Sequence, residues 1–569
     1  MEFRIIQANL YNFFEFQKPY PVSKVLEIAD FTEYVYRMDI CIPSTCNRKD
    51  VENILQWAVK GPYRAEVKFC KVKDEKVLFS STQIICIITI SIFILCVFSG
   101  TILDTLFTLN LVNVPCGKGH ILHNFVSFSL ITSTQNLFST DSDSETRFLC
   151  GMKFLLLCLE VYSHIPLFIV ISYTTTEQFN NFPNMSSNVF LEVISQALSM
   201  IEIYFFLSGF LTFYLRRVDK KRPALYYLMF LIQRYIRLTI PLLCLFVFFM
   251  LLPLSGEGPH WDLVYKEAEN VEKYWWRYIL QIQNFYNINL TFSSHTWFLN
   301  VLMQLTVITV PLLYIRDRWP RIGTVLLCIL TMAGIISHTS QLLITKCIFI
   351  LGLSINLENF GKLLENIYSK PYFSHLSSYC LGLLIGHVLA EKKQLKFRKT
   401  IVVSFWIATI CLMGLAFFGL HNYRVDPSPN ESIILAHQIL SPFAWTAIIA
   451  WICVACISEY GGILSKFLSS DFFLIMDRLT LWIYILHPLS ILYIYGQRRN
   501  HQVFREIYLW MLYIMAMFIS IIVSVFCYTF LQIPISNIVV KIFSPESSKK
   551  NAHLGNKNST EEALEKKVS

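Results

Sequence analysis

The chain has 569 residues, of which 54% are hydrophobic, 15% aromatic and only 15% charged, with a formal net charge of +9. Soluble domains carry about 25% charged residues, so this composition excludes an ordinary soluble protein, and the high apolar content excludes a disordered chain. No basic stripe is interleaved with aromatic residues, so no nucleic-acid partner is expected. A polytopic membrane protein remains.

The first 78 residues contain three clustered cysteines, Cys41, Cys46 and Cys70, which are the disulfide candidates. An odd number leaves one of them without a partner in this segment. Most other cysteines lie inside apolar runs, where we expect buried thiols, and no metal site is expected. Residues 1–20 carry several charges and lack an uninterrupted apolar core, so they do not form a signal peptide.

Apolar runs long enough to cross a hydrocarbon core of about 30 Å need about 20 residues. We therefore expect an all-α membrane protein with eleven transmembrane helices, near residues 79–100, 150–173, 194–215, 235–255, 296–315, 322–338, 373–390, 400–420, 437–457, 472–495 and 508–532. A further run at 339–357 is interrupted by Lys346, and we interpret it as a membrane-proximal loop.

The loops 216–234, 316–321 and 391–399 are rich in Lys and Arg, and their alternation places all three on one face of the membrane. The positive-inside rule makes that face cytoplasmic. Residues 1–78 and the loop 256–295 then lie on the luminal or extracellular face. A luminal N-terminal segment normally needs a signal peptide, so we interpret the chain as a fragment or as a sequence that lacks its first part.

Glycosylation sequons provide an independent indication of this topology. The sequons at Asn184, Asn289 and Asn430 all fall in loops assigned to the luminal or extracellular face, and these three are the predicted glycosylation sites. A fourth, at Asn558, lies in the polar tail that we assign to the cytoplasm.

Lys153 and His164 lie eleven residues apart in one apolar run, which puts them on one helix face about 16 Å apart. A histidine inside a membrane span is a candidate functional residue, and an imidazole can act as general base toward a hydroxyl. Lys153 would lie near the cytoplasmic surface, where it could meet an anionic ligand. Alternatively, Lys153 snorkels to the interface and His164 is only hydrogen-bonded near a helix end.

Glu202 lies in the next apolar run, where a carboxylate needs a partner, and Ser208-Gly209 allows close approach of another helix. We expect either a functional role for Glu202 or a structural pair with a basic residue. Arg234 and Arg237 share a face of the following span, where two guanidinium groups suit the diphosphate of a coenzyme. The alternative is ordinary anchoring by positive charge at the cytoplasmic end.

His487, Arg478 and His295 are candidates for a second polar site. His295 follows a tryptophan-rich stretch that we otherwise interpret as an aromatic belt. His487 precedes Pro488 within an apolar run, so it marks either a break in the helix or a polar element in a membrane cavity. No Walker loop, GxSxG, HExxH or EF-hand spacing occurs, so the chemistry of those motifs is not expected.

The order of these motifs resembles the nose-resistant-to-fluoxetine family of animal membrane proteins, whose main body belongs to the acyltransferase-3 superfamily. The resemblance covers roughly residues 35–535, and the matching segments are Cys41–Cys46, Phe128–Leu130, Gly151 to His164, Phe205–Phe210, Arg234–Leu238, Gly258-Pro259, Trp275-Trp276, His295–Trp297, Gln304, Lys370–Tyr372, Gly382 with Gly386, Gly461-Gly462 and Arg478 to Pro488.

The resemblance implies a luminal N-terminal domain of which residues 1–78 are a truncated remnant, a leading span with a cytoplasmic linker over 79–148, and a ten-span acyltransferase body over 149–535. Residues 536–569 are expected to form a polar, disordered cytoplasmic tail.

For activity, the resemblance implies transfer of an acyl group from acyl-CoA, a co-substrate entering from the cytoplasm, to a hydroxyl acceptor that is a lipid or a small molecule. No tightly bound cofactor is expected, and membrane lipids are the surrounding partners. His164 matches the superfamily's intramembrane histidine and would be the base, with Lys153 and Glu202 as further catalytic candidates. Arg234 and Arg237 match its basic pair and, with Lys153, would bind acyl-CoA.

The chain departs from the superfamily at two site positions. Lys153 stands where the superfamily has arginine, which keeps the charge but loses the bidentate fork, and Leu302 stands where relatives carry an acidic residue. Glu202 replaces an aspartate, and two luminal cysteines, one before Trp275 and one before His295, are absent. We therefore keep two hypotheses: an acyltransferase for groups other than amino-acyl groups, or a catalytically weak relative that transports or senses lipids or lipophilic small molecules. The plasma membrane and the endoplasmic reticulum both fit.

Overall fold

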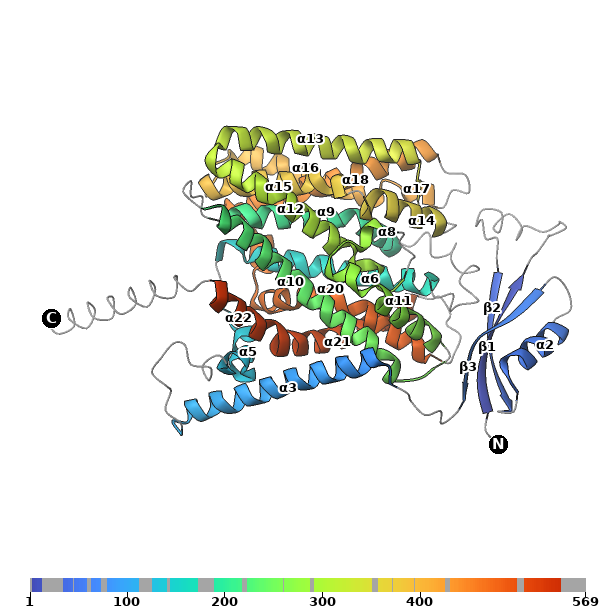
Figure 1. Cartoon of the computed structure of the whole chain (residues 1–569). Coiled ribbons are helices and arrows are strands. Elements are labelled where there is room, and N and C mark those ends of the chain that lie inside the picture. The colour runs from blue at the N-terminus through green and yellow to red at the C-terminus, as the bar shows by residue number, and fades with distance from the viewer. Residues whose placement is uncertain are drawn as a thin grey trace.

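The protein is a bundle of long helices with a small sheet at one end of the chain (Figure 1). The computed structural model describes residues 3–12, 34–43, 46–58, 63–72, 79–111, 125–140, 144–171, 189–216, 223–258, 260–286, 291–349, 357–370, 372–392, 394–424, 430–498 and 506–543.

Eleven helical stretches in this part of the chain are long and apolar enough to cross a membrane, which confirms the predicted number of spans. Their helices are α3 (Ser81–Thr108), α6 (Phe148–Ile171), α9 (Ala197–Tyr214), α10 (Ala224–Leu251), α12 (Trp297–Arg318), α13 (Pro320–Thr345), α15 (Leu376–Lys392), α16 (Lys399–Phe418), α18 (Glu431–Ile457), α20 (Asp471–Gln497) and α21 (Glu506–Cys527). Helices α3, α13 and α16 expose most of their apolar side chains at the periphery, whereas α9, α15, α18 and α20 form the interior.

Shorter elements connect and cap these spans. They are α5 (Leu130–Phe138), α8 (Val189–Ser195), α11 (Trp261–Ile279), α14 (Leu357–Leu363), α17 (His421–Arg424), α19 (Gly462–Leu468), α22 (Ile533–Phe543), the 3-10 turns η1 (Val126–Phe128), η2 (Ser144–Thr146), η3 (Leu252–Leu254), η4 (Gln283–Phe285), η5 (Ser294–Thr296) and η7 (Tyr372–His375), and the π-helical turns η6 (Leu364–Ser369) and η8 (Tyr528–Gln532).

The N-terminal segment adds a sheet that the sequence analysis did not predict. Strands β1 (Phe3–Asn12), β2 (Tyr34–Pro43) and β3 (Tyr63–Val72) form an antiparallel sheet in the order β2-β1-β3. Helix α2 (Arg48–Ala58) buries Val51 and Leu55, as expected for an amphipathic helix that covers a sheet. Cys41 lies in β2 and Cys70 in β3, but their side chains are outside the described part, so the disulfide stays a prediction.

The ambiguous run around Lys346 divides at that residue. Helix α13 extends to Thr345, two turns past the predicted end, and Lys346 ends it in the left-handed conformation with φ 46°. The described residues from 346 to 349 are not helical, in agreement with a loop.

The three predicted cytoplasmic loops meet at one end of the bundle. Arg216, beside the first loop, pairs with the buried Asp317 of the second, and Arg316 contacts His387 near the third. We call this the basic end. The opposite end, where α3 begins and where Thr82 donates to Glu272 of α11 at 2.5 Å, is the α11 end.

Helices α9 and α15 are in close contact because glycines face the neighbouring backbone. A Cβ on Gly209 would lie 2.2 Å from the Tyr379 carbonyl oxygen, and a Cβ on Gly382 would lie 2.1 Å from that of Phe206. Small residues at such crossings are the usual means of close packing in membrane bundles. This confirms the close approach predicted at Gly209 and brings α9 against the start of α15.

The segment 256–295 does not remain at the surface, and this corrects the prediction of a simple loop. Its helix α11 packs along α10 and kinks at Tyr274. Beyond the helix, the Gln281 amide donates to Thr239 Oγ1 at 2.9 Å inside the bundle. Thr239 precedes Met250 by eleven residues, about 17 Å along α10. The chain therefore dips into the bundle before α12 begins.

Helices α6 and α20 run parallel and in register. Lys153 Nζ lies 2.6 Å from Asp477 Oδ1, and His164 Nδ1 lies 2.7 Å from His487 Nε2, so the paired residues are 324 and 323 positions apart. The difference in residue number between the paired positions hardly changes over three helical turns. The two helices therefore stay in contact, side by side and in the same direction, along this length. The spacing of about 16 Å between the two pairs separates a charged site near the basic end from a histidine site nearer the α11 end.

Candidate functional site

Three histidines from three elements meet in the bundle. The rings of His164 in α6 and His487 in α20 are stacked at 4.9 Å between centroids, and His295 in η5 lies 5.5 Å from His487. His487 and His295 were predicted to form a second polar site, but the structure joins them to His164 in one centre. Within the described ranges, no three His, Cys, Asp or Glu side chains are arranged to hold a metal ion.

The hydrogen bonds of His487 determine which nitrogen of His164 can accept a proton. His487 Nδ1 lies 3.2 Å from the Ile483 carbonyl oxygen, which can only accept, so Nδ1 carries the hydrogen in the neutral ring. His487 Nε2 is then the acceptor for His164 Nδ1–H at 2.7 Å. His164 is thereby left with an unprotonated Nε2, the atom that a general base uses.

Glu160 lies beside that free nitrogen, one helical turn before His164. Its Oε1 is 3.5 Å from His164 Nε2, an ion-pair distance. The side chains of His164 and Glu160 remain 13% and 10% exposed, whereas His487 is fully buried and His295 is 4% exposed. His164 and Glu160 thus keep a small exposed area, whereas His487 has none.

His295 is fixed by the chain that returns from α11. Its Nδ1 donates to the Phe292 carbonyl at 2.9 Å, and its own carbonyl accepts from Tyr484 Oη at 2.7 Å. The backbone of Ile485 is a further hydrogen-bonding neighbour of this imidazole, so His295 is held by the chain on several sides.

Helix α11 holds this segment in place. Glu267 accepts from the Ser293 backbone N–H at 3.0 Å, and Tyr278 donates to Ser293 Oγ at 2.9 Å. Burial raises the pKa of the Glu267 carboxyl above its ordinary range, and the hydrogen bonds with Ser293 offset part of that rise.

The charged site near the basic end contains Lys153 and an acidic partner. Lys153 Nζ contacts both carboxylate oxygens of Asp477, at 2.6 and 2.8 Å, and both side chains are partly exposed. An anionic ligand would therefore compete with Asp477 for the ammonium group.

Arg478 does not belong to the histidine centre with which it was grouped. Nine residues separate it from His487, about 14 Å along α20. Its guanidinium group instead donates to the carbonyls of Asn136 and Leu137, both at 2.6 Å, and to Ser139 Oγ at 3.0 Å. Arg478 thus satisfies the open carbonyls at the C-terminus of α5.

The two arginines of α10 diverge. Arg234 points to α9, where it donates to Ser208 Oγ and to Thr212 Oγ1, the latter at 3.2 Å. Arg237 is exposed, and together with Arg478 it lies within electrostatic range of Tyr528. Of the predicted pair, Arg237 is therefore the better placed for an incoming anion, while the joint phosphate grip stays a prediction.

Glu202 lies in a separate buried pair, apart from the described contacts of His164. Its Oε1 is 2.5 Å from His375 Nδ1, and His375 Nε2 donates to the Tyr368 carbonyl at 2.7 Å. Glu202 and His375 are 1% and 0% exposed. The Phe205 ring stacks on His375 and closes this pair off. The geometry matches the structural pair that was the alternative prediction for Glu202.

The remaining predicted residues are placed as follows. Leu302 is buried in the apolar core, so no charge replaces the acidic residue of the relatives. Asn430 caps α18 by accepting from the Ser432 backbone N–H at 3.0 Å, while Asn184 and Asn289 lie outside the described residues. Helix α20 continues through Pro488, so His487 marks a polar element and not an interruption of the helix.

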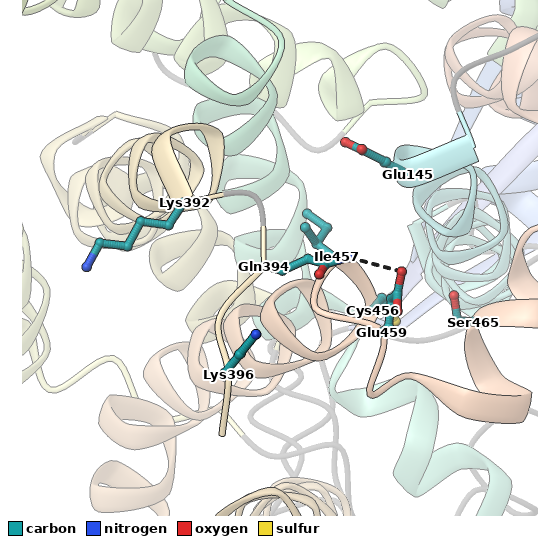
Figure 2. Close-up of a pocket in the computed structure, with 8 residues that line it drawn as sticks. All are labelled: Glu145, Lys392, Gln394, Lys396, Cys456, Ile457, Glu459 and Ser465. Carbon is teal, nitrogen blue, oxygen red and sulfur yellow. Dashed lines mark hydrogen bonds between the residues drawn. The ribbon is translucent and has the colours of Figure 1, made fainter. Parts of the chain in front are cut away.

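A cavity of about 550 Å³ lies at the basic end and contains none of the predicted site residues (Figure 2). Lys392 and Lys396 line it together with Glu145 and Glu459, and Gln394 donates to Glu459 at 3.1 Å. Its charges are mixed, so it has no clear preference for an anion.

Three partners in these centres were missed from the sequence. Glu160 could have been found, because an acid one turn before a membrane histidine is itself unusual. Asp477 and His375 become partners only through the packing of distant helices, for which the sequence contains no local signal.

Comparison with known proteins agrees with this architecture. The family model described as "Acyltransferase domain" matches residues 147–529. "Nose resistant to fluoxetine protein 6" of Caenorhabditis elegans is 24% identical over 508 residues, which cover 80% of this chain and 60% of that protein. No solved structure matches the chain significantly. Because the family model covers well over half of the chain, and the spans are those of a multi-pass membrane protein, the chain belongs to the acyltransferase-3 family.

Proposed function

We propose that the protein transfers an acyl group from acyl-CoA to a hydroxyl acceptor, a lipid or a small molecule, with His164 as the general base. The observation that carries the proposal is the His164–His487 contact. It leaves His164 Nε2 unprotonated, on the side of the ring that faces Glu160 and away from His487.

In the proposed step, His164 Nε2 takes the proton of the acceptor hydroxyl while its oxygen attacks the thioester carbonyl carbon. The carbon–sulfur bond breaks, and the imidazolium returns the proton to the departing thiolate of CoA. One O–H and one C–S bond are lost, and one C–O and one S–H bond are formed. His487 would keep the imidazole in the required tautomer, as the third member of a triad does.

Acyl-CoA would approach from the basic end, which the positive-inside rule assigns to the cytoplasm. Lys153 and Arg237 would supply positive charge there for its phosphates, and Arg234, which is turned to α9, would add to it at longer range. The separation of about 16 Å between Lys153 and His164 lies within the reach of a pantetheine arm, which would carry the thioester to the histidines.

A second function is favoured by the Lys153–Asp477 ion pair. A lysine whose charge is already satisfied at 2.6 Å binds an anion less strongly than a free arginine would. A protein whose acyl-CoA site is weakened in this way would bind or move lipids or lipophilic molecules without catalysing acyl transfer.

The test is acyl transfer from radiolabelled acyl-CoA of short and long chain length, with the purified protein in lipid nanodiscs and lipid extract as acceptor. The proposal expects a labelled ester product from the native protein and its loss in His164→Ala. Label transfer that is equal in both proteins would contradict His164 as base. No transfer by a folded native protein would favour the second function.

A further inference from the structure

One buried ionisable group beside the histidines takes no part in the proposed reaction. Among the described residues, Glu160 is the carboxyl at ion-pair distance from the working nitrogen of His164, and it lies in a membrane span with 10% of its side chain exposed. A carboxylate in such a position is costly unless it has a role or a partner.

The geometry distinguishes Glu160 from the other buried carboxylates paired with histidines. Glu202 and His375 approach to 2.5 Å and are shielded from solvent, which is the arrangement of a closed structural pair. Glu160 stays 3.5 Å from His164 Nε2, so that nitrogen keeps its lone pair available.

The charge change during the reaction gives Glu160 its role. When His164 accepts a proton, a positive charge appears on a ring whose other face is held by the neutral His487. His295 adds no compensating charge, and Tyr204 of α9 and Tyr484 of α20 are titratable groups within electrostatic range of Glu160. In the described part of the chain, Glu160 is the carboxyl at ion-pair distance from His164, so it is the group placed to supply a negative charge near this imidazolium.

We infer that Glu160 is a positioning residue of this site, whose carboxylate stabilises the imidazolium that forms when His164 accepts a proton. The inference rests on the proposed acyl transfer. Glu160 exchanges no proton in the proposed step, so the balance of bonds is unchanged: the hydroxyl proton moves to His164 Nε2 and then to the CoA sulfur.

The test compares Glu160→Gln, which keeps the size and removes the charge, with Glu160→Asp, which keeps the charge. In nanodiscs with acyl-CoA, Glu160→Gln is expected to lower kcat about 100-fold and to leave KM for acyl-CoA within about twofold. Glu160→Asp should recover part of the loss. In a His164→Ala background, Glu160→Gln should have no further effect, because both act through one proton transfer.

The matched control is Glu192→Gln. Glu192 is also a buried carboxylate, 3.0 Å from His421, but it lies in α8 outside the site, so native kcat is expected. If Glu160→Gln does not fold, Glu160→Asp still tests the role of Glu160. Its carboxylate lies one methylene farther from His164, so kcat should fall below the native value while KM stays constant.

The outcomes separate this inference from the proposed function. Native kcat in Glu160→Gln and Glu160→Asp, with His164→Ala inactive, overturns the role of Glu160 and leaves the acyl transfer standing. Absence of transfer by the folded native protein overturns both. A lower kcat in Glu160→Gln, with partial recovery of kcat in Glu160→Asp, supports both the role of Glu160 and the acyl transfer.

Discussion

At the scale of single residues, the site separates binding from chemistry. The Lys153–Asp477 pair lies about 16 Å from the histidines, too far to affect the reacting atoms directly. Charge near a phosphate changes binding in the ground state and in the transition state alike, so it alters KM and leaves kcat unchanged. The effect of each residue on the two constants therefore shows which part of the site it serves.

We predict that Lys153→Ala raises KM for acyl-CoA about tenfold, the equivalent of one lost charge contact, with kcat within about twofold. Lys266→Ala is the control, because Lys266 is an exposed lysine in α11, paired only loosely with Asp262 at 3.6 Å. Steady-state kinetics with varied acyl-CoA measure both constants. A fall in kcat at unchanged KM would show that Lys153 acts in the chemical step.

We predict that the Glu202–His375 pair stabilises the folded protein and takes no part in catalysis. Removing one member of a buried ion pair leaves an uncompensated polar group and typically costs about 3–5 kcal/mol, whereas replacing both by apolar residues costs much less. Glu202→Ala should therefore unfold at a markedly lower temperature than native protein, and Glu202→Leu with His375→Phe should recover much of the loss. Thermal unfolding in detergent measures this. A Glu202→Gln variant with native unfolding temperature and no acyl transfer would instead restore the catalytic prediction for Glu202.

At the scale of elements, the crossing of α9 and α15 depends on the absence of side chains. Gly382 faces the Phe206 carbonyl, where any Cβ would require the helices to move apart. Gly382→Ala is predicted to lower the unfolding temperature by several degrees. Gly414→Ala is the control, since a Cβ there meets nothing within 4 Å and alanine is favoured over glycine inside a helix by about 0.5–1 kcal/mol. Equal unfolding temperatures for the two variants would contradict the close crossing.

Helix α11 gives a prediction on pH, because Glu267 holds the segment that carries His295. Its raised pKa means that the folded state binds more protons than the unfolded state once the pH exceeds the ordinary carboxyl value of about 4.3. Stability contributed at this position therefore falls as the pH rises through that window. Glu267→Gln should gain unfolding temperature relative to native protein as the pH rises above about 4.3. A difference that does not change with pH would contradict a buried, proton-binding carboxyl at this position.

At the scale of the whole molecule, the sequence predicts whatever depends on local composition. The eleven spans follow from the lengths of apolar runs, and the common end of the three basic loops follows from their alternation. The functional centre depends on contacts between residues more than 300 positions apart, such as His164 with His487. Such contacts are determined by the packing of the helices, so the sequence suggested His164 and His487 separately but not their meeting. The sheet of the first 72 residues and the dip of the chain after α11 also depend on tertiary contacts.

The central claim is that His164 performs proton transfer in an acyl transfer across this bundle. The most direct measurement is the rate of ester formation from radiolabelled acyl-CoA by native protein and by His164→Ala in nanodiscs, at equal amounts of folded protein. We predict a fall of about 10²–10⁴-fold in kcat, the usual contribution of a general base. Equal rates in the two proteins would contradict the account.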